Sequence, residues 1–175
     1  HERLARFDGV WAGRAITEPG TGSDSANIRT TAVLDGDEYV INGEKIYVTS
    51  GDRADAIVVW ATLDRTLGRA AIKSFVVPKG TPGMRVDRLE HKLGIRASDT
   101  ATIIFDNCRV PTENLLGAAE ADPKQGFAGA MATFDATRPL VAAAGLGVAR
   151  AALEFLKEKL AENGVQIRYG LPRQK

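Results

Sequence analysis

The sequence predicts an α+β protein in which an antiparallel β-barrel or sandwich domain precedes one long helix from an incomplete helical bundle. Two observations support this fold class. From residue 13 to about residue 110, short β-branched and aromatic runs alternate with glycine and proline turns, a pattern typical of barrels and sandwiches. From about residue 126 to residue 163, the chain is rich in Ala, Leu, Met, Glu and Lys at helical spacing.

Six or seven strands are predicted in the first half, and no helical period interrupts them. The clearest pair is expected to form a hairpin across Asn42-Gly43, because this dipeptide readily takes the positive φ values of a type I′ turn. Asp35-Gly36 is expected to end the strand before it. In chain order, the predicted strands are Arg29–Leu34, Glu38–Ile41, Glu44–Thr49, Ala56–Leu63, Ile72–Val77, Met84–Leu89 and Thr100–Phe105.

A single helix is predicted from about Gly126 to Asn163. Leucines recur three and four residues apart after Leu153, with charged side chains between them. Pro139 is expected to kink or restart the helix, and Gly164 is expected to end it, because glycine is favoured just past a helix end. Apolar residues lie on more than one face, so this helix needs neighbouring helices that the sequence does not contain.

Composition and charge indicate an ordinary soluble globular protein. The chain is 44% hydrophobic and 26% charged, and its 23 basic and 22 acidic residues leave a net charge of +1. No basic block stands out, which argues against a nucleic-acid or membrane-surface partner. The longest stretch of small apolar residues, Pro139–Val148, is about half of what a membrane span needs, so no span is expected.

Cysteine and histidine usage narrows the chemistry further. The single cysteine, Cys108, excludes an intrachain disulfide, and its apolar flanks predict a buried free thiol. His1 and His91 have no partner at ligand spacing, so no metal site is expected. The chain begins with His1 and shows no secretion-signal layout, which indicates an internal fragment or a processed chain from the cytoplasm or the mitochondrial matrix.

The segment Ile16–Asp24 (ITEPGTGSD) is the first candidate site. It fails the dinucleotide-binding fingerprint, because a serine occupies the third glycine position and a strand follows instead of a helix. A turn with exposed amides and the hydroxyls of Thr17 and Ser23 remains, and such a turn can bind carbonyl or phosphate oxygens. Taken alone, a plain Pro-Gly loop is the simpler interpretation. Glu18 and Asp24 are interpreted as turn-stabilising or surface groups without a catalytic role.

The segment Lys45–Ser50 (KIYVTS) is the second candidate. Because side chains alternate along a strand, Tyr47 and Thr49 are expected on one face and Val48 on the other. A flat ring beside a hydroxyl suits the stacking and hydrogen bonding of a planar heterocycle. An ordinary half-buried strand explains the same residues when this segment is taken alone.

The third candidate is TFDATRP, at residues 133–139. On a helix, Arg138 lies near both Phe134 and Asp135. This spacing is typical of a surface ion pair worth a few tenths of a kcal/mol. The alternative is that the arginine and the aspartate face the polar tail of a ligand.

Together and in this order, the segments resemble the acyl-CoA dehydrogenase family over about residues 13–155. The last of the matching motifs is most similar to the straight-chain, medium-chain-like branch. Five motifs in the family's order favour the functional interpretation of each candidate site over the plain one. The motifs are TEPGTGSD, DGDEYVINGEKIYVTSG, TPGMRVDRLEHKLGIRASDT, FDNCRVPTENLLG and GFAGAMATFDATRPLVAAAGLGVARAALE.

The resemblance implies FAD as the cofactor and FAD-dependent conversion of an acyl-CoA thioester to the 2-enoyl-CoA, as in fatty-acid β-oxidation. It also implies a flavin-binding β domain at residues 13–118, between a remnant of an N-terminal helical domain at 1–12 and the truncated start of a C-terminal helical domain at 119–175. The implied cofactor-binding residues are Ile16, Thr17, Gly22, Ser23, Tyr47, Val48 and Thr49, with tryptophan common in the family where Tyr47 stands. The implied substrate-binding residues are Ser23, Phe134, Asp135, Ala136, Thr137 and Arg138.

The chain also departs from the family's pattern. The family's general base is a glutamate on a later helix, and nothing after Asn163 matches it, so no catalytic residue is assigned. The resemblance further implies an electron-transfer flavoprotein as the oxidant and a homo-oligomer arranged as a dimer of dimers. Two other functions stay open: a non-catalytic binding or assembly module, and an acyl-CoA oxidase that passes electrons to oxygen.

Overall fold

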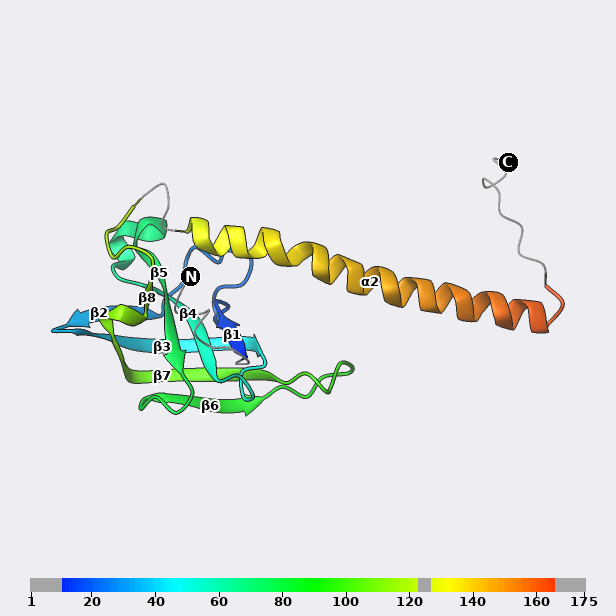
Figure 1. The fold of residues 1–175 in the computed structure, drawn as a ribbon, viewed down its shortest axis with the longest axis horizontal. Helices are drawn as coiled ribbons and strands as arrows, with labels where there is room; N and C mark the ends of the chain where they lie inside the picture. Colours follow the sequence, from blue (N-terminus) through cyan, green and yellow to red (C-terminus); the bar gives the residue numbers. More distant parts are fainter. Residues whose placement is uncertain (1–10, 123–126, 166–175) are drawn as a thin grey trace. The chain divides into compact units, whose positions relative to one another are not determined.

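The computed structural model describes residues 11–122 and 127–165, which belong to two units, His1–Ala128 and Gly129–Lys175. The first unit is a β-sheet with two short 3₁₀ segments, and the second carries the long helix α2 (Ala128–Glu162) (Figure 1). The expected α+β class is confirmed. The segment expected as an N-terminal remnant, residues 1–12, lies outside the described residues except for its last two.

The first unit contains a single mixed sheet. Its strands are β1 (Ala12–Ala15), β2 (Thr31–Asp35), β3 (Glu38–Thr49), β4 (Ala56–Thr62), β5 (Ile72–Pro78), β6 (Met84–Leu89), β7 (Thr100–Pro111) and β8 (Leu115–Leu116). They follow the order β6-β7-β3-β2-β4-β5-β8, and β1 pairs with β4 beside this path. Because β1 and β2 pair with β4 in parallel, the sheet is not purely antiparallel as the sequence had suggested.

Three predicted strands match the structure within one residue at either end: β4, β5 and β6. All seven residues of β4 are buried, as expected for an unbroken apolar run that neighbours strands on both sides. The core around β4 includes the rings of Tyr39 and Phe75, which meet edge to face with centroids 4.9 Å apart. Cys108 is fully buried there, and burial raises the pKa of its thiol to about 11, so the predicted buried free thiol is confirmed.

The hairpin predicted at Asn42-Gly43 is wrong, because β3 runs unbroken through both residues. The turn lies earlier in the chain, between β2 and β3, where Gly36 has a φ of 67°. Asn42 instead accepts a hydrogen bond on Oδ1 from the Asn107 amide of β7, at 2.8 Å, at an irregularity in the β3–β7 pairing. A Cβ on Gly43 would lie 2.4 Å from Thr30 Oγ1, so glycine is required here by a close approach and not by a turn.

Two further differences come from hydrogen bonds that hydrophobic periodicity does not capture. β2 begins at Thr31 and not at Arg29, because the amides of Arg29 and Thr30 donate to a side chain outside the sheet. A 3₁₀ segment, η1 (Arg65–Ala71), occupies a region where no helix was expected. Asp64 caps it by accepting from the Thr66 amide at 2.8 Å, and such short turns carry no 3.6-residue period.

Helix α2 matches its prediction closely. It ends with the expected glycine: Gly164 has a φ of 73°, its amide donates to Ala161 O at 3.0 Å, and the Val165 amide donates to Leu160 O at 2.8 Å. The helix does not restart at Pro139, which lies within its continuous span. Two side-chain hydrogen bonds to the helix backbone precede the proline, from Thr133 Oγ1 to Gly129 O and from Thr137 Oγ1 to Thr133 O, at 2.8 and 2.9 Å.

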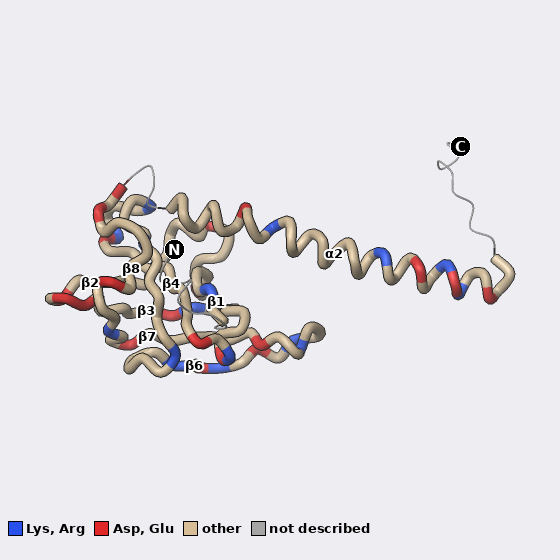
Figure 2. Tube along the Cα trace, viewed as in Figure 1, with Lys and Arg blue, Asp and Glu red and all other residues tan. Residues whose placement is uncertain are grey.

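The apolar residues of α2 are mostly exposed in this chain. Between Arg138 and Arg150 no residue is charged, and the tube drawing shows this uncharged stretch along the helix (Figure 2). By length and composition alone α2 could cross a membrane, with a mean hydropathy of 1.5 over its most apolar 18 residues. Helices that other helices cover in globular proteins pass the same test, so this property alone does not indicate a membrane span. The exposed large apolar residues of α2 are Met131, Leu140, Val141, Leu146, Val148, Leu153, Phe155 and Leu156.

Candidate flavin site

The turn after β1 is organised by Glu18, whose side chain is only 5% exposed. Its backbone pairs with Thr21 in both directions, with N–O distances of 3.1 and 3.0 Å. Its carboxylate accepts from the Arg29 amide at 2.6 Å, from the Thr30 amide at 2.9 Å and from Thr30 Oγ1 at 2.6 Å. Glu18 therefore stabilises the turn as the sequence had suggested, but from a buried position and not from the surface.

Lys45 of β3 completes this arrangement from inside the sheet. Its side chain is fully buried, and its Nζ donates to Glu18 Oε1 at 2.8 Å and to the Ile16 carbonyl at 3.2 Å. Burial lowers the pKa of Lys45 to about 8, although the Glu18 carboxylate opposes this shift. Burial raises the pKa of Glu18, but Lys45 and the hydrogen bonds from Thr30 Oγ1 and the Arg29 amide outweigh that effect, and the net pKa lies below its usual value.

The first two candidate segments lie side by side. The amide of Ile46 donates to the Thr17 carbonyl at 2.9 Å, next to the Lys45–Ile16 contact. This bond is available because β3 bulges here: Lys45 pairs with Ile103 and Val48 with Ala101, so two β3 residues face one residue of β7. A bulge leaves one residue outside the ladder, and the freed amide turns to the loop.

The bulge also determines which side chains at the end of β3 are exposed. Tyr47 adopts a left-handed backbone conformation with a φ of 57° and leaves 62% of its side chain exposed. Val48 is fully buried and Thr49 is exposed, so the expected alternation of burial is confirmed. A non-glycine residue with positive φ is uncommon and often occurs where a bulge redirects a side chain. The aromatic ring and the threonine hydroxyl are thus both available to a ligand.

The far part of the turn is open. Ser23 is exposed, and a Cβ on Gly20 or Gly22 would meet no atom within 4 Å. Among residues 11–122 and 127–165, the amides of Gly20, Gly22 and Ser23 donate to no protein acceptor. Ile16 and Thr17 are half-buried at its base. Free amides on an open glycine turn suit an anionic or carbonyl ligand.

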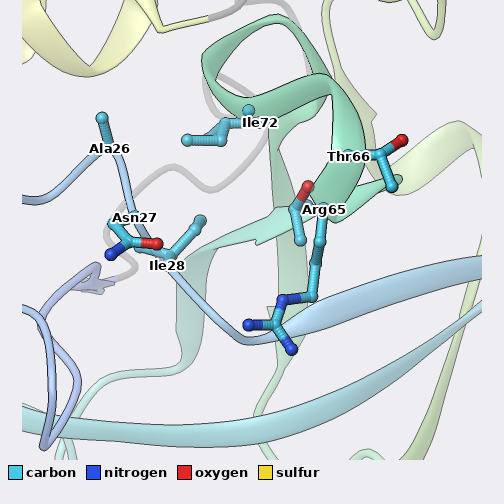
Figure 3. Close-up of a pocket in the computed structure, with 8 residues that line it drawn as sticks. Ala26, Asn27, Ile28, Arg65, Thr66 and Ile72 are labelled. Carbon is cyan, nitrogen blue, oxygen red and sulfur yellow. The ribbon is translucent and has the colours of Figure 1, made fainter.

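A pocket of about 310 Å³ is lined by residues of this loop and of η1 (Figure 3). Asn27 and Ile28 line it from the loop, and Arg65 and Thr66 line it from η1. Thr62 also borders it, and its buried Oγ1 has no hydrogen-bond partner among the described residues. The pocket thus combines an exposed guanidinium with a hydroxyl that lacks a partner, which suits a polar or anionic ligand group.

The third candidate segment lies on α2, in the second unit. Arg138 Nη1 donates to Asp135 Oδ1 at 2.8 Å, and its Cζ lies 5.7 Å from the centre of the Phe134 ring. Both members of the pair are mostly exposed, so the predicted proximity is confirmed in the form of a surface ion pair. Ala136 is exposed, while Thr137 is half-buried and donates to the helix backbone.

That Lys45 and Glu18 are buried and paired with each other was not predicted from the sequence. A lysine in a strand is usually solvated, and its partner lies 27 residues away in the chain. One signal was present: Tyr39, Ile41 and Lys45 share the same parity along β3, and the first two are apolar. The alternation of the strand therefore indicated that the Lys45 side chain lies on the buried face, where a charge requires a partner.

This chain is similar to known proteins of one family. Residues 13–108 match the family described as "Acyl-CoA dehydrogenase, middle domain". The short-chain specific acyl-CoA dehydrogenase of Rattus norvegicus mitochondria is 46% identical over 149 residues, which cover 85% of this chain and 35% of that protein. The cyclohex-1-ene-1-carbonyl-CoA dehydrogenase of Geobacter metallireducens is 43% identical over 155 residues, covering 87% and 40%.

The solved structure of butyryl-CoA dehydrogenase from Megasphaera elsdenii superposes with a TM-score of 0.82 at 36% identity, covering 94% of this chain and 41% of that one. This chain therefore spans about a third of the length of the curated relatives that it matches. More than half of the chain lies within the matched middle domain. On these grounds, the chain belongs to the acyl-CoA dehydrogenase family.

Proposed function

We propose that this chain supplies the flavin-facing part of an enzyme that uses FAD to convert an acyl-CoA thioester to the 2-enoyl-CoA. The observation that carries the proposal is the 2.9 Å bond from the Ile46 amide to the Thr17 carbonyl. This bond puts the open turn next to the end of β3, where Tyr47 and Thr49 are exposed. The isoalloxazine would lie between these two segments.

The residues present fit FAD. Tyr47 offers an exposed aromatic face for stacking, Thr49 and Thr17 offer hydroxyls for the polar edge of the ring, and Val48 anchors this segment in the core. Ile16 would pack beside the ring, and the amides of Gly22 and Ser23 would bind the pyrophosphate. When bound, FAD supplies hydride acceptance, while the protein supplies orientation and hydrogen bonds.

The substrate contacts divide between the two units. In the first unit, Ser23 would contact the thioester ligand, and the pocket beside Arg65 would hold an anionic group of CoA. In the second unit, the exposed segment Phe134–Arg138, with Ala136 and Thr137 between its ion-pair partners, would bind the pantetheine and phosphate part. We assign the general base that removes the α-proton to a glutamate outside this chain, because proton removal requires a base within hydrogen-bond distance.

The wider organisation follows from the same proposal. Residues 13–118 would form the middle domain, and residues 119–175 would begin a C-terminal helical domain whose other helices cover the exposed apolar residues of α2. An electron-transfer flavoprotein would reoxidise the flavin, and the assembled protein would be a dimer of dimers in the bacterial cytoplasm or the mitochondrial matrix.

The test uses the whole polypeptide that carries this chain, prepared without cofactor and titrated with FAD. Thr49→Val is expected to raise the FAD dissociation constant about three- to tenfold, the loss of one hydrogen bond. Thr112→Val serves as the matched control, because Thr112 follows β7 at the opposite end of β3 and is exposed. Adding acyl-CoA without an oxidant is expected to bleach the visible flavin absorbance of the loaded protein.

Three results would contradict this proposal. A colourless wild-type protein that does not respond to added FAD would favour the non-catalytic binding module. Stoichiometric peroxide from acyl-CoA and oxygen would favour the oxidase. Equal FAD affinities for Thr49→Val, Thr112→Val and wild type would contradict the placement of the flavin at the end of β3.

A further inference from the structure

The buried pair Glu18–Lys45 is not explained by ligand contacts or by stability. Its side chains are 5% and 0% exposed, with Nζ 2.8 Å from Oε1. Taking two charges out of water carries a penalty that their attraction often fails to offset, and apolar replacements of similar volume are frequently as stable. Such pairs are retained in some proteins because they select one arrangement of the chain over its alternatives.

The contacts of the pair show which arrangement it selects. Lys45 Nζ holds the carbonyl of Ile16 at 3.2 Å, and Glu18 is the ion-pair partner itself, so both residues that flank Thr17 are fixed. Thr17 has its own bond to the next residue of β3, from the Ile46 amide. Three consecutive residues of the turn are therefore tied to two consecutive residues of the strand.

The same carboxylate also closes the far end of the loop. Glu18 accepts from the amides of Arg29 and Thr30, so the loop from residue 19 to residue 28 starts and ends at one side chain. Thr21 Oγ1 donates to the Asn27 carbonyl at 3.1 Å and joins the two sides within the loop. The position of its open tip, where Ser23 lies, thus depends on a charge that is buried at its base.

We propose that Glu18 and Lys45 are positioning residues of the flavin site, because their buried ion pair joins both ends of the turn to β3 and thereby fixes the turn opposite Tyr47 and Thr49. The inference rests on the proposed function and deepens it. Neither side chain is exposed enough to touch the cofactor, so both act through the backbone that they hold. The pair sets the spacing between the two walls of the flavin site.

The experiment compares three variants of the whole polypeptide: Glu18→Gln, Lys45→Met and the double variant. Glutamine keeps the volume of Glu18 but removes its charge and one of its acceptors, and methionine keeps most of the hydrocarbon of Lys45. Each cofactor-free protein is first checked for cooperative thermal unfolding above the assay temperature. FAD affinity and the visible circular dichroism of the bound flavin at saturation are then measured.

The proposal expects folded Glu18→Gln and Lys45→Met proteins to bind FAD at least tenfold more weakly than wild type. It also expects an altered visible circular dichroism spectrum at saturation, which loss of stability alone would not produce. The control variant is Arg109→Met, which removes an exposed ion pair with Asp35 on another part of the same sheet. It should leave both the affinity and the spectrum unchanged.

The outcomes separate this proposal from the proposed function. If wild type binds no FAD, the flavin function itself fails. If wild type binds FAD and folded variants match its affinity and spectrum, the positioning role is overturned while the flavin site stands. If Lys45→Met does not fold, Glu18→Gln decides. If no variant folds, the pair is needed for the fold itself, and the positioning role is again overturned.

Discussion

The sheet unit and helix α2 treat the same kinds of residue in opposite ways. In the sheet unit, the ion pair Glu18–Lys45 is buried, and so are all seven residues of β4. On α2, the pair Asp135–Arg138 is 72% and 68% exposed, and apolar residues such as Leu146 and Val148 are more than 70% exposed. One region thus completes its own interior, whereas the described part of the other leaves its large apolar residues exposed.

This contrast shows that an ion pair has no fixed energetic value. An exposed pair is screened by water and contributes up to about 1 kcal/mol. A buried pair is strongly destabilising when it is broken, because the remaining charge has no partner and no water.

The largest effect is expected for Lys45→Ala in the sheet unit. Glu18 would keep a buried negative charge without its cationic partner, and unfolding free energy should fall by about 3–5 kcal/mol. Urea unfolding followed by circular dichroism measures it. Arg138→Ala on α2 is the matched change and should cost less than about 1 kcal/mol. Similar losses for the two variants would mean that the Lys45 environment is solvated.

The second effect concerns two glycines with positive φ. Gly43→Ala should destabilise the protein by about 2–4 kcal/mol, because its Cβ would lie 2.4 Å from Thr30 Oγ1 and displace a partner of Glu18. Gly36→Ala should cost only about 1 kcal/mol, since its Cβ meets nothing within 4 Å and only the φ of 67° is unfavourable. Urea midpoints for the two variants test this order, and a reversed order would refute the close packing at Gly43.

The third effect is a loss of stability in acid. Because the pKa of Glu18 is lower in the folded chain than in the unfolded one, its contribution is present above the unfolded value of about 4.3 and is lost as pH falls below it. Each unit of pKa difference corresponds to about 1.4 kcal/mol. Glu18→Gln should flatten the dependence of unfolding free energy on pH in this range. A Glu18→Gln profile as steep as that of wild type would contradict this assignment.

The smallest effect is expected on α2 itself. Arg150 Nε lies 2.8 Å from Glu154 Oε1, but both side chains are mostly exposed. Arg150→Ala should change the unfolding free energy by about 0.3–0.5 kcal/mol, and the change should vanish in high salt. A loss above 1 kcal/mol in thermal unfolding would show that this surface is covered by another part of the polypeptide.

Local sequence signals predicted the elements whose structure is set locally. The unbroken apolar run of β4 and the glycine stop of α2 both matched, because burial on both sides and capping leave direct traces in neighbouring residues. The segments of the candidate flavin site were identified from the order of the family's motifs, since each taken alone has an ordinary explanation. The resemblance implied that they share a ligand, but no local signal showed the Ile46–Thr17 bond, which joins residues 29 positions apart.

Two of the errors share one physical origin. Asn42-Gly43 has the chemistry of a tight turn, but the approach of Thr30 and the amide of Asn107 hold it straight within β3. Lys45 has the chemistry of a surface residue, but Glu18 holds it inside. In both cases a distant partner decides the outcome, and a single sequence does not show which distant residues meet.

The strand order has a consequence for how this protein forms. One neighbour of β3 in the sheet is β2, which directly precedes it in the chain. Its other neighbour is β7, and there Glu38 pairs with Pro111, more than seventy residues later in the sequence. Sheets built from such distant pairings form slowly, because loop closure must precede the contacts that reward it. On a ribosome, the hairpin of β2 and β3 would emerge long before β7, with an open edge and an incomplete binding surface. Cofactor recognition is therefore expected to be a late event in the maturation of this chain.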